Sequence, residues 1–167
     1  YGCFHDLSVT HEVPFRCRHS TQLVAERLGD LPQRQEIRAR VAVHDPCHYG
    51  RRREEYEPSR VLVAAVPGLE LVELERNREN TACCGGPASG FQPELARQLA
   101  GERMDEAVAV GAELLLTPCS GCVSTLEGAG RERGIAIDDE VGPLAKSLGI
   151  AHENRLASLF GASSVEE

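Results

Sequence analysis

Arg40–Cys47 reads RVAVHDPC, a short apolar run stopped by Asp-Pro with a cysteine directly behind it. A continuous apolar run of this length, bounded by turn residues, is typical of a buried strand that feeds a loop. The pattern recurs at Glu113–Cys119, which reads ELLLTPC. Leu69–Leu74 is a third strand candidate, and we expect the double cysteine Cys83–Cys84 to follow it directly. Each of these strands should therefore deliver cysteine to the loop at its carboxyl end.

Helical patterns separate these strands. They cover Ser20–Leu28, Pro58–Val66, Pro93–Val110, Gly121–Arg131 and Glu140–Leu148, with a fourth short strand at Ile135–Ile137. On the longest helix we expect Leu95, Leu99, Met104 and Val108 to line the buried face. Strands that alternate with helices predict an α/β fold with a mostly parallel sheet and flanking helices. In such a sheet the loops at the carboxyl ends of the strands gather at one edge, where ligands bind.

The composition excludes several classes of protein. A formal net charge of −8 argues against a nucleic-acid surface, which needs a basic face. No apolar run is long enough for a membrane span, and no signal-peptide pattern opens the chain. The seven cysteines are an odd number and include an adjacent pair, which does not fit an extracellular disulfide framework. Clusters of this kind in a reducing cytoplasm more often bind metal or carry out redox chemistry, so we expect a cytoplasmic protein.

Five of the cysteines are spaced almost evenly about Ala82–Pro87, which reads ACCGGP. They are Cys47, Cys83, Cys84, Cys119 and Cys122, with 35 residues between the first two and 34 between Cys84 and Cys119. Thiolates are soft ligands that suit iron–sulfur clusters and zinc, and five exceed the four that a cubane or a structural zinc requires. Gly85 and Gly86 permit the bend that lets adjacent cysteines converge, and their N–H groups can hydrogen-bond sulfur. The sequence therefore predicts a metal-cluster site.

The CxxC pair, Cys119 and Cys122, should lie at a helix N-terminus, which lowers thiol pKa values. Cys17 is expected on a strand as a small core residue, and His44 is expected to form structural hydrogen bonds in its loop. His48 is a candidate donor to a cluster or substrate sulfur. Arg51–Arg53 is expected to be solvated at a helix entrance.

An internal repeat links the two ends of the chain. Gly2–Leu7 resembles Gly121–Leu126, and each is followed by an apolar-alternating segment and a short helix ending in Leu-Gly. Cys3 would then be the last cysteine of an earlier copy, and the chain looks cut from something longer. We therefore expect residues 1–40 to be the remnant of a first repeat plus a connection, 41–150 a second, complete repeat, and 151–167 a C-terminal helix and tail.

The five-cysteine spacing, with His-Asp-Pro-Cys at its start, resembles the CCG (cysteine-rich) domain family. That family includes the cysteine-rich subunit of heterodisulfide reductase and the iron–sulfur subunits of glycolate, lactate and glycerol-3-phosphate oxidation systems. The resemblance implies a Rossmann-like domain in tandem copies and a noncubane [4Fe-4S] cluster. It assigns Cys47, Cys83, Cys84, Cys119 and Cys122 as the cluster ligands, beside Gly85 and Gly86. The chain departs from the family in a slightly short second spacer and an incomplete first copy.

The resemblance implies an iron–sulfur redox module, a subunit or fragment of a multi-subunit oxidoreductase. It would relay electrons from a flavoprotein partner to a disulfide substrate or a quinone-side acceptor, with ferredoxin-type iron–sulfur subunits or domains as further partners. A membrane-bound partner could hold it at the membrane. Two alternatives stay open: a structural or interaction domain stabilised by zinc, and a dithiol reductase that uses Cys119 and Cys122. The sequence determines neither the substrate nor the electron donor, nor whether the chain is itself catalytic.

Overall fold

The computed structural model describes residues 2–11, 13 and 15–150, and of residues 2–5 only the backbone. At its centre lies a four-stranded sheet in the order β2-β1-β3-β4, with every neighbouring pair parallel. The strands are β1 (Ala39–Val43), β2 (Leu69–Leu71), β3 (Leu114–Leu116) and β4 (Ala136–Asp138). The predicted α/β class and parallel sheet are therefore confirmed.

The order of the strands creates a crevice at the centre of the sheet. β1 and β3 are neighbours, with Val41 opposite Leu114 and Val43 opposite Leu116. The chain leaves β1 toward β2 on one side and returns in β3 on the other, and ligands bind at such a switch point in sheets of this kind. Cys47 follows β1 and Cys119 follows β3. Both cysteine loops therefore start at this crevice.

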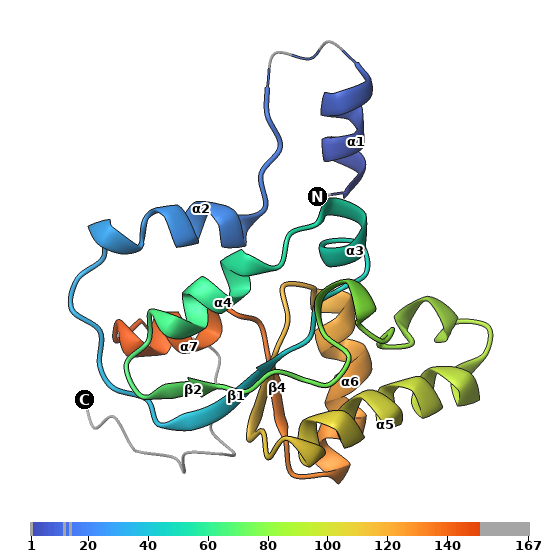
Figure 1. Cartoon of the computed structure of the whole chain (residues 1–167). Coiled ribbons are helices and arrows are strands. Elements are labelled where there is room, and N and C mark those ends of the chain that lie inside the picture. The colour runs from blue at the N-terminus through green and yellow to red at the C-terminus, as the bar shows by residue number, and fades with distance from the viewer. Residues whose placement is uncertain (1, 12, 14, 151–167) are drawn as a thin grey trace.

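Helices cover both faces of the sheet (Figure 1). One layer holds α2 (Ser20–Glu26), α4 (Glu57–Ala64) and α7 (Gly142–Ser147), and the other holds α5 (Pro93–Ala109) and α6 (Ser120–Glu132). The remaining helices are α1 (Gly2–Thr10), α3 (Gly50–Arg53) and three 3₁₀ turns at Leu28–Asp30, Arg78–Asn80 and Gly86–Ala88.

Alternate residues of the central strands enter two separate cores, because successive side chains of a strand point to opposite faces. Ala42 and Leu115 pack with Met104 of α5 and Leu126 of α6. Val41, Val43, Leu114 and Leu116 pack on the opposite face with Val63 of α4. Residues on both faces are buried, so each strand reads as a continuous apolar run.

Two predictions about the strands are wrong. β2 ends at Leu71, three residues short of the predicted Leu74, and residues 72–82 form a loop with one 3₁₀ turn before the double cysteine. Cys17 does not lie on a strand or in the core: residues 15–19 are irregular and Cys17 is half-buried. After Leu71 one more backbone hydrogen bond joins the chain to β1, from the Val72 N–H to the carbonyl of Val41 at 2.8 Å, and the chain then leaves the sheet. Among the described residues, no strand pairs with the segment around Cys17.

The buried face of α5 also differs from the predicted one. Leu95 and Val108 are exposed, and Met104 is the predicted residue that is fully buried. The helix turns alanines toward the sheet instead, together with one charged residue, Arg103. Small side chains let the helix approach the core closely and leave room for the long side chain of Arg103.

The two members of the internal repeat share helices but not strands. Gly2 begins α1, and Gly121 lies in the first turn of α6. The apolar segment that follows forms β4 in the later copy but is irregular in the earlier one. The predicted C-terminal helix and tail, residues 151–167, lie outside the described residues.

Candidate metal centre

The loop that carries Cys47 is held by a buried ion pair. The carboxylate of Asp45 accepts two hydrogen bonds from Arg60, at 2.8 and 3.1 Å, and a third from the backbone N–H of Arg78 at 2.8 Å. Arg60 also bonds the carboxylate of Glu73 at 2.7 and 2.9 Å. Because Asp45 lies two residues before Cys47, this network fixes the start of the cysteine loop on α4.

The double cysteine depends on the glycines that follow it. Gly85 has φ +89°, and a Cβ there would lie 2.6 Å from the carbonyl oxygen of Ala96 on α5. No other residue type combines this backbone conformation with so close an approach. The Gly85 N–H donates to the sulfur of Cys83 and the Gly86 N–H to the sulfur of Cys84, both at 3.4 Å. The loop therefore presents two sulfurs with backbone donors already in place.

The CxxC pair lies at the N-terminus of α6, with Cys119 as the capping residue. A hydrogen bond from Cys122, together with the N–H groups of Cys122 and Gly121, lowers the pKa of Cys119 to about 6. The pKa of Cys122 is instead raised, because the Cys119 and Cys84 sulfurs accept its proton and the side chain is buried. The prediction of a lowered pKa is therefore right for Cys119 and wrong for Cys122.

The three loops meet at their sulfurs. Cys84 Sγ and Cys122 Sγ lie 3.2 Å apart, within hydrogen-bonding distance for sulfur. Hydrogen bonds from Cys122 and His44 lower the pKa of Cys84 to about 4, so Cys84 is the thiolate of the pair. Burial raises the pKa of Cys47, and so does negative charge on Cys83 and Cys84. All five predicted cysteines thus interact directly or through one another.

These groups form two sides, which we call the inner wall and the outer rim. The inner wall is Cys84, Cys122 and His44, whose exposed fractions are 5%, 6% and 1%. Their ligand atoms lie within 4.8 Å of one another. The outer rim is Cys47, Cys83 and Cys119, which are all half-buried. The five thiols therefore line a site that is closed toward the core and open toward solvent.

Sequence reasoning gave His44 only a structural role in its loop, and it did not identify Arg103 as part of the site. Burial lowers the pKa of His44, whose ring nitrogen Nδ1 accepts a hydrogen bond of 3.0 Å from Arg103 Nε. A ring nitrogen of His44 also lies within 4.8 Å of Cys84 Sγ, so the role of His44 reaches beyond its own loop. Arg103 is fully buried although it looks like a surface residue of α5. Arg103 lies far along the sequence from every cysteine, so no motif or spacing indicated that it belongs to the site.

Comparison with known proteins shows which family the chain belongs to. The family model described as "Cysteine-rich domain" (CCG) matches residues 41–127, which include all five cysteines. This chain belongs to the CCG cysteine-rich domain family. The segment that matches the family model begins in β1 and ends in α6, so it includes most of the α/β fold described above.

Several curated proteins are similar to this CCG domain. A heterodisulfide reductase subunit of Methanosarcina acetivorans is 31% identical over 91% of this chain and 40% of the relative. Lactate utilization protein A 1 of Bacillus mycoides is 33% identical over 71% of this chain and 48% of the relative. The probable iron-sulfur-binding oxidoreductase FadF of Bacillus subtilis is 33% identical over 65% of this chain and 16% of the relative. The chain spans 39–40% of the length of the heterodisulfide reductase subunits that it matches.

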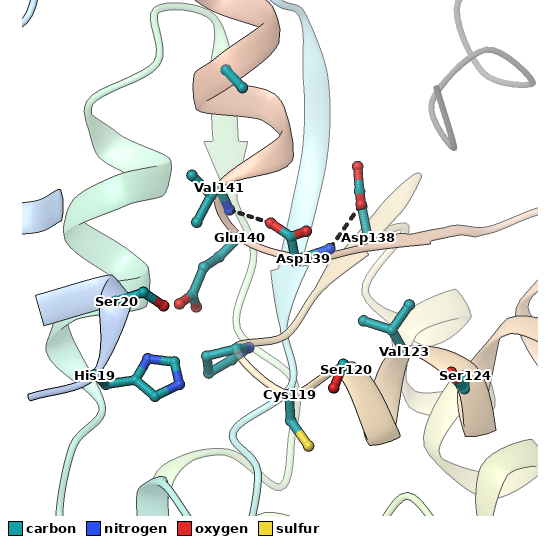
Figure 2. A pocket seen from close by; sticks show the side chains of 12 residues that line it. His19, Ser20, Cys119, Ser120, Val123, Ser124, Asp138, Asp139, Glu140 and Val141 are labelled. Atoms are coloured by element: carbon teal, nitrogen blue, oxygen red, sulfur yellow. Dashed lines mark hydrogen bonds between the residues drawn. The ribbon is translucent and has the colours of Figure 1, made fainter. Parts of the chain in front are cut away.

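A cavity of about 610 Å³ opens beside the outer rim of the CCG domain. Figure 2 shows Cys119 and Ser120 on one side of it and His19 and Ser20, at the start of α2, on another. Glu140 points toward Ser20, and its carboxylate accepts hydrogen bonds from Thr21 and from Ser59. Burial raises the pKa of Glu140 to about 7. The cavity gives a small molecule or a partner's side chain access to Cys119.

The other predicted residues lie outside the cluster of sulfurs. His48 is exposed, and its backbone N–H bonds Cys47. Arg51 donates to the backbone oxygens of Glu79 and Thr81 and so ties α3 to the loop before the double cysteine. The side chain of Cys3 lies outside the described residues. Among the described helices, none has the length and apolar character needed to cross a membrane.

The chemistry of the donor set fits a thiolate-bound metal cofactor. Two sulfurs at 3.2 Å share one proton, which a bound metal would displace. Backbone N–H groups already point at Cys83 and Cys84, as they do toward cluster-bound sulfur in iron–sulfur proteins. The three half-buried cysteines of the outer rim leave one side of the site open for a cofactor to enter.

Proposed function

We propose that Cys47, Cys83, Cys84, Cys119 and Cys122 bind an iron–sulfur cluster, a noncubane [4Fe-4S] cluster as in the family. The observation that carries this proposal is the close approach of Cys84 and Cys122 at 3.2 Å, from loops 38 residues apart. Sulfurs with lowered pKa values on two of the loops supply thiolate ligands at neutral pH. Gly85 and Gly86 hold the double cysteine in its bend and direct N–H donors to its sulfurs.

The wider function that fits this site is an iron–sulfur redox module of a multi-subunit oxidoreductase. A cluster held there would accept and pass on single electrons. Flavoprotein and ferredoxin-type partners would deliver the electrons, and a disulfide or a quinone-side acceptor would receive them. The relatives named heterodisulfide reductase and iron-sulfur-binding oxidoreductase support this assignment. The half-buried outer rim is the side from which electrons and an acceptor can approach.

We also infer that the domain is one of two tandem repeats. Residues 41–150 would form one repeat, and residues 1–40 would hold the end of another together with a connection. The support is the matching Gly-Cys start of α1 and α6, both helical.

Anaerobic reconstitution of the reduced chain with iron and sulfide tests the proposal. We expect a brown protein with iron and acid-labile sulfide in equal amounts and an EPR signal of a [4Fe-4S] cluster after reduction or oxidation. The matched control is Cys17→Ser, since Cys17 is half-buried like the outer rim but belongs to none of the three loops. A wild-type chain that takes up no iron under these conditions overturns the proposal.

A zinc site is the second candidate, favoured by the grouping of His44, Cys84 and Cys122 within 4.8 Å. Zinc requires four ligands and uses an unprotonated histidine nitrogen. His44 Nδ1 already accepts a hydrogen bond from Arg103, so the ring proton sits on Nε2 and the buried guanidinium repels a cation. Purification with one tightly bound zinc and no labile sulfide would favour this candidate over the cluster.

A further inference from the structure

Arg103 is a fully buried cation in the middle of α5, with every part of its guanidinium engaged. Its Nη1 donates to the backbone oxygen of Arg76 at 2.7 Å and to Glu106 Oε2 at 2.6 Å. Its Nη2 donates to the hydroxyl of Thr81 at 3.2 Å. A charge is buried in this way only when it is paired and hydrogen-bonded. Thr81 and Arg76 belong to the loop before the double cysteine, so Arg103 also anchors that loop.

The Nε–H donor of Arg103 decides which ring nitrogen of His44 carries the proton. Arginine has five N–H donors and no acceptor, so the 3.0 Å bond between Arg103 Nε and His44 Nδ1 requires an unprotonated Nδ1. A neutral imidazole with unprotonated Nδ1 has its hydrogen on Nε2. A ring nitrogen of His44 lies within 4.8 Å of Cys84 Sγ. With Nδ1 occupied by Arg103, Nε2–H is the donor that remains to face that sulfur.

We propose that Arg103 and His44 are a positioning pair that holds a permanent Nε2–H donor on the sulfur of Cys84 and thereby raises the reduction potential of the cluster bound there. The proposal rests on the cluster assignment made above. Neither residue is a ligand in this scheme. His44 lies within 4.8 Å of a sulfur proposed as a ligand, and Arg103 acts through His44.

Electrostatics sets the sign of this effect. Reduction adds one negative charge to the cluster, and a hydrogen bond to a ligand sulfur stabilises that charge. The guanidinium of Arg103 adds a fixed positive charge one imidazole ring away, in an interior where water does not screen it. Glu106, bonded to Arg103 at 2.6 Å, cancels part of that charge. Removing Arg103 and removing the charge of Glu106 should therefore shift the potential in opposite directions.

The first test uses the metal-free, reduced chain and needs no cluster. Ring ¹⁵N chemical shifts of His44 in the ¹⁵N-histidine-labelled protein report which nitrogen carries the proton. We expect a protonated Nε2 and an unprotonated Nδ1 in the wild type, and loss of this single form in Arg103→Met. A wild-type ring with its proton on Nδ1 overturns the proposal.

The second test measures the midpoint potential of the reconstituted cluster by EPR-monitored titration. We expect Arg103→Met to weaken one-electron reduction at least about tenfold, which is 59 mV for a one-electron couple. Glu106→Gln should raise the potential, an opposite shift that general loosening of the fold would not produce. The control is Arg97→Met on the same helix, whose side chain is 76% exposed and paired only with Glu94 in the structure, and which should leave the potential unchanged.

Variants of His44 separate the donor from the charge behind it and serve if Arg103→Met fails to fold. His44→Gln can keep an amide donor near the position of Nε2, whereas His44→Leu has none. We expect the potential to fall further in His44→Leu than in His44→Gln. A wild-type chain that binds no cluster would refute the iron–sulfur assignment. The ¹⁵N experiment on the metal-free chain would still show whether Arg103 fixes the proton of His44 on Nε2. Equal potentials in wild type, Arg103→Met and His44→Leu would refute the positioning role alone.

Discussion

The inner wall and the outer rim of the thiolate site are held in place by different forces. Cys84 and Cys122 of the inner wall belong to the same apolar cluster as Leu115 and Leu126, so the packing of the core sets their positions. On the outer rim, Cys47 sits on a loop anchored by the Asp45–Arg60 ion pair. Core packing is dense and resists displacement, whereas a loop anchor can fail locally. The inner wall should therefore determine whether a cluster forms, and the outer rim how it is reached.

The largest expected difference between the two sides is in metal content. Cys84→Ser should reduce iron per chain at least about tenfold, the scale seen when a group that supports a metal is lost. Cys119→Ser should lose less, because solvent reaches this half-buried position and an oxygen ligand can take the place of the sulfur. Iron and sulfide analysis after reconstitution measures both, with Cys17→Ser as the unaffected control. An equal loss of iron in Cys84→Ser and Cys119→Ser would mean that the inner wall and the outer rim contribute equally to cluster binding.

The anchor of the outer rim should be the next most sensitive feature. Arg60→Met leaves Asp45 charged and without its partner, and the two side chains are only 6% and 3% exposed. Removing one partner of a buried ion pair costs about 3–5 kcal/mol of folding free energy. Urea unfolding of the metal-free chain measures this. The exposed pair Arg97–Glu94 offers the comparison, since Arg97→Met should change stability by less than about 0.5 kcal/mol.

The cavity beside the outer rim predicts a dependence of stability on pH. Glu140 has a pKa raised to about 7 by burial, against 4.5 when solvated. Between these values the folded chain keeps a proton that the unfolded chain has released, so raising the pH favours unfolding. We expect the free energy of unfolding to fall by about 3 kcal/mol from this group between pH 4.5 and pH 7. Glu140→Gln should lack this fall in the free energy of unfolding. If the variant shows the same dependence of stability on pH as the wild type, Glu140 is not its source.

The smallest effect we predict concerns the bend under the double cysteine. Gly85→Ala places a Cβ 2.6 Å from the Ala96 oxygen at a φ of +89°, which should cost about 1–3 kcal/mol. Gly90→Ala is the matched control in the same segment, because nothing lies within 4 Å of a Cβ there. Thermal or urea unfolding of both variants measures the difference. Equal stabilities would mean that the bend is not pressed against α5.

The strands and helices that could be predicted from the sequence are those whose formation depends on the pattern of residues within the element itself. β1 and β3 were predictable because a continuous apolar run needs burial on both faces, and α6 because a helical pattern follows Pro118 directly. The segment around Cys17 has a similar alternation, yet no neighbouring strand pairs with it in the described residues, and it stays irregular. A strand is a tertiary element, so its pattern is necessary but not sufficient.

The cysteines of the site were accessible to sequence reasoning, but their surroundings were not. Their spacing and the rule that parallel strands gather their carboxyl ends at one edge brought three loops together. Arg103 could not be predicted in this way, because a charged residue in an amphipathic helix is normally assigned to the solvent face. Its burial depends on three partners from two other segments: His44 after β1, and Arg76 and Thr81 in the loop before the double cysteine. Long-range partners of this kind leave no periodic signal.

The 3.2 Å separation of Cys84 and Cys122 also makes the metal-free chain vulnerable. One sulfur is already a thiolate, and the other is within reach, so an oxidant that removes two electrons can join them as a disulfide. Such a bond would consume two of the proposed ligands, both on the inner wall, where solvent and reductants have little access. The order of events after synthesis then decides the fate of the chain. Iron and sulfide must bind before an oxidant reaches the two sulfurs. A chain in which the disulfide has formed first cannot bind the proposed cluster until a reductant breaks that disulfide.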